Sequence, residues 1–203
     1  RKRVQRDLVI NPEMARSICR LSSELNRQIG ILVHRSGKVE SIIVGSYNQV
    51  MIPQLGNVRA AGGRLRGVRL IHTHLAGEDI SDEDLMDLLF LRLDLLSVIK
   101  VADDGLPEKI YSAHLLPAAG GDKSWAFLEP VHPANQHDSV EELIAAVERE
   151  FAQGDRATTV DRGQDRAILV SVSTEPKLQA EESLAELVEL ARSDNIIILD
   201  TVL

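Results

Sequence analysis

The stretch LIHTHLAGEDISDEDLMDLL, residues 70–89, decides the fold, because an apolar strand runs into His-x-His and then into a helix start. Side chains two apart on a strand point to the same side, so His72 and His74 should present their imidazoles together. Asp84, in the first turn of the following helix, can add a carboxylate oxygen. Two imidazoles, one carboxylate and an open position are the format of a catalytic zinc site.

The helix start also has a purely structural interpretation. Ser81 is a good N-cap, Asp84 stands at the third helical position of a capping box, and the acidic first turn complements the helix dipole. His72 and His74 would then be polar residues at the end of a strand, with ring nitrogens bonded to the backbone. Both interpretations stay open on the sequence alone.

The order His72, His74, Ser81, Asp84 is similar to the signature of the JAMM (JAB/MPN) metallopeptidases. The resemblance implies that two histidines and the aspartate hold zinc and that Ser81 supports the oxyanion. The chain has Gln28 where that family has its water-activating glutamate, and zinc without a general base makes a poor hydrolase. We therefore expect a triad that is structural or vestigial and assign no catalytic residue, with a zinc peptidase or isopeptidase as the alternative.

Composition limits the remaining possibilities. The 203-residue chain is 44% hydrophobic and carries a net charge of −8, which argues against attraction of its whole surface to nucleic acid. The single cysteine, Cys19, excludes an internal disulfide and falls on the apolar stripe of the first helix. No signal peptide and no apolar run long enough for a bilayer are present, so the sequence predicts a cytoplasmic protein.

Local patterns predict an α/β domain with a mixed sheet over residues 1–117. Asn11 and Pro12 begin a helix that should run to about Asn26, and Arg35-Ser36-Gly37-Lys38 should join two strands as a hairpin. A further helix is expected at 81–96. The strands are expected at Ile29–His34, Val39–Val44, Gln49–Ile52, Gly67–His74, Ser97–Ala102 and Lys109–Leu116. This element order resembles the JAB-like fold.

The rest of the chain has a different organisation. Residues 118–165 are expected to be a linker with one helix at 140–152, because the segment begins with prolines and a glycine pair and then shows an apolar stripe. Residues 166–203 read as strand, helix and strand, at Ala167–Val172, Glu181–Ser193 and Ile196–Val202. That unit should form a parallel, right-handed βαβ, whose uncovered apolar faces could support a homodimer.

A second resemblance lies in this terminal unit. Residues 166–172, 180–191 and 199–202 resemble the opening of the nucleotide-binding N-terminal domain of HflX-type GTPases, and the preceding region resembles the extra N-terminal segment of the long members. The resemblance implies a cytoplasmic GTPase that uses GTP and Mg²⁺ and associates with the large ribosomal subunit. This chain would be a regulatory or docking part that is not itself catalytic, because it contains no G-x-x-x-x-G-K-[S/T] phosphate loop.

Four arginines frame a glycine-rich turn and form a candidate RNA-facing patch. They are Arg59, Arg64, Arg66 and Arg69. Contacts between such a patch and ribosomal RNA phosphates would be strongly dependent on salt. The alternative for the same residues is ordinary solvated surface.

Overall fold

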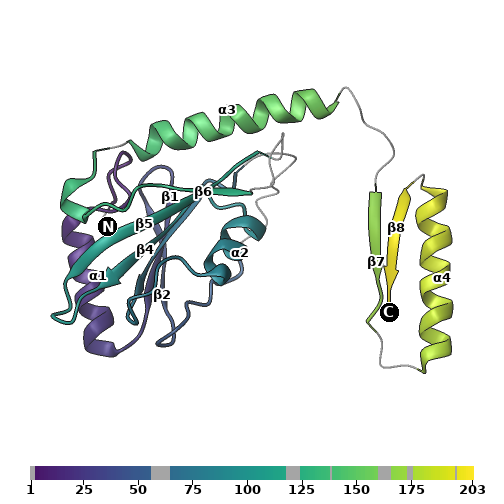
Figure 1. Cartoon of the computed structure of the whole chain (residues 1–203), viewed down its shortest axis with the longest axis horizontal. Coiled ribbons are helices and arrows are strands. Elements are labelled where there is room, and N and C mark those ends of the chain that lie inside the picture. The colour runs from purple at the N-terminus through teal and green to yellow at the C-terminus, as the bar shows by residue number, and fades with distance from the viewer. Residues whose placement is uncertain are drawn as a thin grey trace. The chain divides into compact units, whose positions relative to one another are not determined.

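A computed structural model describes residues 3–55, 65–117, 124–137, 139–159, 166–172, 176–194 and 196–203. The chain divides into two compact units, Arg1–Asp155 and Arg156–Leu203 (Figure 1). The first unit therefore continues beyond residue 117 and takes in the short strand β6, Trp125–Phe127, and most of helix α3, Val140–Thr159.

The first unit is built on a six-stranded mixed sheet with the order β2-β1-β3-β4-β5-β6. Only β3 and β4 run parallel, and every other neighbouring pair is antiparallel. The strands not yet given are β1 Ile29–His34, β2 Val39–Val44, β3 Val68–His74, β4 Leu95–Val101 and β5 Pro107–Leu115. The predicted α/β class with a mixed sheet is confirmed.

Helix α1, Pro12–Leu25, matches the sequence prediction closely. It ends because Asn26 adopts a left-handed conformation, φ 51°, which asparagine tolerates better than most residues. Its stripe of Ala15, Ile18, Cys19 and Ser22 is buried. Burial raises the pKa of the Cys19 thiol to about 12, so this cysteine is an inert core residue as predicted.

The register of the strands sets which residues share a face of the sheet. Thr73 faces α1, because its Oγ1 lies 2.7 Å from the hydroxyl of Ser22. Alternation along β3 then places His72 and His74 on the opposite face. Helix α2, Asp82–Phe90, covers that opposite face, since its Asp84 contacts His72. The two histidines are thus enclosed between the sheet and α2.

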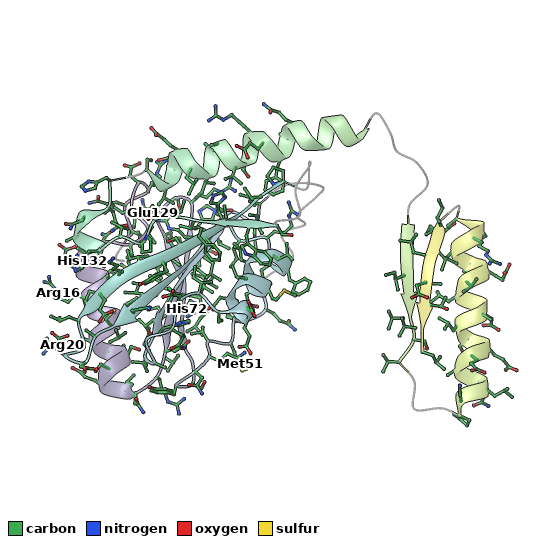
Figure 2. All side chains as sticks on the ribbon, viewed as in Figure 1. Arg16, Arg20, Met51, His72, Glu129 and His132 are labelled. Carbon is green, nitrogen blue, oxygen red and sulfur yellow. The ribbon has the colours of Figure 1, made fainter. Side chains whose placement is uncertain are left out.

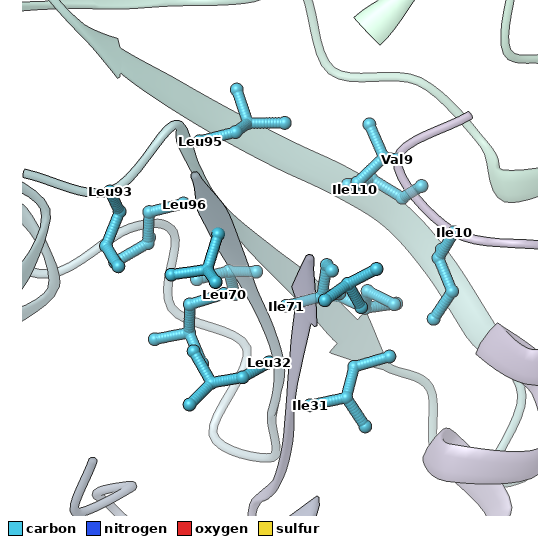
Figure 3. Close-up of a cluster of buried hydrophobic side chains, with 14 of the residues drawn as sticks. Val9, Ile10, Ile31, Leu32, Leu70, Ile71, Leu93, Leu95, Leu96 and Ile110 are labelled. Carbon is cyan, nitrogen blue, oxygen red and sulfur yellow. The ribbon is translucent and has the colours of Figure 1, made fainter. Parts of the chain in front are cut away.

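Apolar side chains fill both faces of the sheet. Ile31, Ile71 and Ile110 lie on the α1 side, whereas Leu32, Leu70 and Leu96 lie on the α2 side (Figure 3). All six are at most 2% exposed. Burial of one such side chain stabilises a fold by about 1.5–3 kcal/mol, so the site is held by a rigid, well-packed support.

An ion-pair network that the sequence did not reveal ties the β1–β2 turn to β4 and α3. Arg35 donates from Nε and Nη2 to the carboxylate of Asp94, at 2.5 and 2.9 Å. The same Nη2 donates to Glu148 at 2.7 Å, and Asp94 also accepts from the backbone of Gly67. The side chain of Asp94 is only 1% exposed.

Two predicted elements were wrong in extent or type. Residues Gln49–Ile52 form no strand, because Ser46 and Gln49 close a tight turn and Val50 then packs beside Gly30. Helix α2 ends at Phe90 instead of 96, because Arg92 takes a left-handed conformation, φ 51°, and β4 begins as early as Leu95.

The second unit is a two-stranded parallel sheet with one helix. Its elements are β7 Arg166–Val170, α4 Lys177–Ser193 and β8 Ile197–Val202. The predicted parallel βαβ arrangement is confirmed. Apolar side chains stay largely exposed on it, including Ile168 and Leu199, each at 58%.

None of the helices in the described residues is both long enough and apolar enough to cross a membrane.

Candidate metal centre

The end of β3 delivers two histidines into the interior of the first unit. His72 is 1% exposed and lies inside the first unit (Figure 2). His74 is 3% exposed, and the ring centroids of the two histidines lie 4.8 Å apart. Burying two imidazoles costs free energy unless their ring nitrogens find partners. The surroundings of these nitrogens therefore indicate what the site binds.

The predicted capping box is present at the start of α2, and its Asp84 is the third residue of the candidate metal centre. Ser81 receives a hydrogen bond from the backbone of Asp84 at 3.2 Å, and its own backbone N–H and hydroxyl donate to Asp84 Oδ2 at 2.9 and 2.7 Å. Asp84 Oδ1 is left facing His72. Ser81 is thus the residue that orients the carboxylate, and the structural and metal-binding interpretations of Asp84 are compatible.

The three side chains converge as the sequence predicted. His72 Nε2 lies 3.0 Å from Asp84 Oδ1, and His74 Nε2 lies 3.5 Å from Asp84 Oδ2. One ligand atom from each residue lies within 4.8 Å of the others. Ligands about 2.0–2.1 Å from a tetrahedral zinc are separated from one another by roughly 3.4 Å. The two separations between a histidine nitrogen and an Asp84 oxygen are close to that value.

The protonation states favour a cation. His74 Nδ1 lies 3.3 Å from the carbonyl oxygen of Glu78, which can only accept, so the proton of a neutral ring belongs on Nδ1. Burial, helped by the neighbouring His72, lowers the pKa of His74. Its Nε2 therefore directs a lone pair towards Asp84.

The carboxyl group of Asp84 is ionised at neutral pH. Burial would raise its pKa, but contacts with His72 and hydrogen bonds from Ser81 outweigh that effect and hold the pKa at about 2. A lone pair and a carboxylate oxygen that face each other repel unless a positive charge lies between them. A metal ion would supply that charge.

Unpartnered buried atoms concentrate at this site. Among the residues that the structure describes, neither ring nitrogen of His72 makes a hydrogen bond of acceptable geometry, although Nε2 is close to Asp84. Buried polar atoms without a partner are rare in native proteins and call for an explanation such as an ion. The residues present therefore fit a metal such as zinc.

Gln28 lies on the same face as the two histidines. Gly30 pairs directly with His72 in the last pair of the β1–β3 ladder, so Gln28 lies two residues beyond that pair, towards the His74 end of β3. Ile29 lines a groove with Met14 and Ile18 of α1, which places its neighbour Gln28 on the other side of the sheet. Gln28 is 0% exposed.

Glu78 is a site residue that the sequence did not single out. Its Oε1 lies 3.6 Å from His74 Nδ1, on the side of the ring away from Asp84. A carboxylate on the outer nitrogen of a metal-binding histidine orients the ring and raises its basicity. The only sequence signal was an acidic residue four positions after His74.

Two of the four arginines of the predicted basic patch, Arg66 and Arg69, lie in the described residues. Arg69 is 2% exposed and donates to the backbone carbonyls of Gln5 and Leu8, so the prediction that it faces RNA fails for this residue. Arg66 donates to the carbonyl of Leu91 at 2.8 Å and is partly buried. Arg59 and Arg64 lie outside the described residues.

Comparison of the chain with protein-family models, with curated proteins and with solved structures found no match.

Proposed function

We propose that the first unit is a zinc-binding domain of JAB-like fold whose metal centre is formed by His72, His74 and Asp84. The observation that carries this proposal is the buried convergence of His72 Nε2 and His74 Nε2 on the carboxylate of Asp84, with no hydrogen bond to either ring nitrogen of His72 within the described residues. Zinc would supply the positive charge that this set of donors lacks and would join β3 to the start of α2. Its role is structural, because Gln28 cannot accept a proton from water as a glutamate would.

Zinc titration of metal-free protein tests this proposal. We expect one equivalent to bind and the first unit to gain stability, since a ligand that binds only the folded state stabilises it in proportion to RT ln(1 + [L]/Kd), about 2.7 kcal/mol at 100 times Kd. The fluorescence of Trp125, the single tryptophan, reports unfolding of this unit alone. A chain that binds no zinc and gains no stability would refute the proposal.

A zinc peptidase or isopeptidase is the second candidate, favoured by Ser81 beside Asp84 in the order His, His, Ser, Asp. The same zinc-loaded sample distinguishes the two. A structural centre should give no turnover of peptide or isopeptide substrates. Turnover that disappears in His74→Ala would make the enzyme the better description.

For the whole chain, we propose a cytoplasmic docking role as the N-terminal part of an HflX-like GTPase that associates with the large ribosomal subunit. What supports it is the resemblance of residues 166–203 to that family, together with the parallel strand pair of the second unit. GTP and Mg²⁺ would then belong to the complete protein. The exposed apolar residues of the second unit would pack against more of that protein or against a second copy of the chain.

Co-sedimentation with purified ribosomal subunits tests the docking role. We expect the chain to pellet with large but not small subunits at low salt, and binding to weaken as salt rises, because phosphate contacts release counterions. Arg59→Glu together with Arg64→Glu should reduce binding if these residues contact RNA. Equal recovery with both subunits, or with neither, would contradict the proposal.

A further inference from the structure

The amide of Gln28 is the least expected buried group in the first unit. Both Oε1 and Nε2 are buried and lack hydrogen-bond partners within the described part of the chain, and the side chain is 0% exposed. Burial of an amide without partners costs free energy, because its hydrogen bonds to water are lost and not replaced. A protein that keeps such a group in its core needs something for it to bind.

The backbone at Gln28 fixes where this amide lies. Its N–H donates to Ser46 at 2.8 Å and its carbonyl accepts from Gly45 at 2.9 Å, so the residue continues β1 in extended form beside β2. On the other side, the backbone N–H of Ile29 donates to Thr73 Oγ1 at 2.9 Å. Gln28 is therefore held at the His74 end of β3, on the face of the sheet that carries His72.

Gly30 keeps the space between these groups open. A Cβ at Gly30 would lie 3.6 Å from His72 Cβ and 3.0 Å from a methyl of Val50. Gly30 thus separates Gln28 from His72 along this face without placing a side chain between them. The buried atoms without partners at Gln28 and His72 thus occur on one face of two paired strands.

We propose that Gln28 is the fourth protein ligand of the metal centre, through Oε1, and that the centre is therefore closed. This inference rests on the proposed zinc-binding function. Structural zinc sites use four protein ligands, whereas catalytic ones keep a position open for water or substrate. Burial of all four residues, with Asp84 the most exposed at 8%, agrees with a closed centre.

Charge also favours a neutral fourth ligand. Two neutral imidazoles and one carboxylate leave a divalent ion with a net charge of +1. Around them lie Glu78, 3.6 Å from His74, and the acidic first turn of α2 with Asp82 and Glu83. A second anion at the metal would meet these carboxylates, whereas the amide oxygen is a neutral donor that the fold already holds in place.

Substitutions at Gln28 with cobalt and zinc test the inference. Gln28→Leu keeps the size and removes the donor, so we expect zinc affinity to fall at least tenfold, on the scale of lost supporting groups at metal sites. Gln28→Glu keeps an oxygen donor, so it should bind zinc more tightly than Gln28→Leu, but less tightly than the wild type because its charge meets the neighbouring carboxylates. Circular dichroism of the metal-free variants confirms that each is folded.

The coordination number of bound Co²⁺ would not change if Gln28 only filled space in the core, so measuring it distinguishes a ligand from a packing residue. In the Co²⁺-loaded wild type we expect the intense visible bands of a four-coordinate site and no rapidly exchanging water in proton relaxation. Gln28→Leu should admit an exchangeable water. Unchanged zinc affinity in Gln28→Leu, or an exchangeable water already in the wild type, would overturn the inference about Gln28 and leave the proposed zinc binding standing. Absence of metal binding in every variant would instead refute the proposed function.

Discussion

Replacing His74 with alanine should abolish most zinc binding, with a loss of affinity of more than about 100-fold. Loss of an outer supporting residue at a metal site costs about 10–100-fold, and loss of a ligand should exceed that. His74 is well placed to show the effect, because its Nδ1 is turned to the Glu78 carbonyl and its Nε2 faces Asp84. Competition against a chromophoric chelator at pH 7.5 would measure the change.

Two further variants make this result specific. His137 is exposed and lies away from the triad, so His137→Ala should bind zinc like the wild type. Glu78→Gln should give an intermediate loss of about tenfold, because the residue orients the ring without holding the ion. Equal affinities in His74→Ala and His137→Ala would remove the metal centre from the first unit.

The sequence predicted the triad because all three residues depend on local geometry. His72 and His74 share a face by strand alternation, and Asp84 is fixed by a capping box that is recognisable from Ser81 alone. The same local rules predicted α1 and the β1–β2 hairpin. Each of these predictions needed only the few residues on either side.

The fourth position of the site could not be predicted in this way. Gln28 is placed on the face of the two histidines by the pairing of β1 with β3, two strands separated by about forty residues of sequence. In the sequence, Gln28 indicated only that the general base of the JAMM metallopeptidases is missing from this chain. Its complete burial and its unpartnered amide are properties of the packed sheet.

The burial of Arg69 also depends on contacts between residues that are distant in the sequence. Arg69 seemed to belong to a surface patch, yet it lies in a buried strand and its guanidinium binds the carbonyls of Gln5 and Leu8. Burial lowers its pKa to about 10. Nothing in a run of arginines tells which one will enter the interior, because the N-terminal segment that covers Arg69 is more than sixty residues away in the chain.

The Arg35 network leads to the second large effect. Asp94→Asn should destabilise the first unit by about 2–3 kcal/mol, because it removes the buried carboxylate of the network and leaves Arg35 with Glu148 as its remaining charge partner. Asp94 is 1% exposed and accepts two hydrogen bonds from Arg35 and one from Gly67. Urea unfolding followed by Trp125 fluorescence would report the loss as a lower midpoint with an unchanged slope.

The matched control is a solvent-exposed ion pair that has one partner on helix α3, as the Arg35 network does with Glu148. Arg6 and Glu141 form one ion pair at 3.0 Å, with side chains 59% and 54% exposed. Glu141→Gln removes one charge, as Asp94→Asn does, but exposed pairs contribute less than about 1 kcal/mol. If the two variants lower the free energy of unfolding equally, burial does not set the strength of the Arg35 network. A much larger loss in Asp94→Asn is the expected result, because Asp94 is buried and Glu141 is exposed.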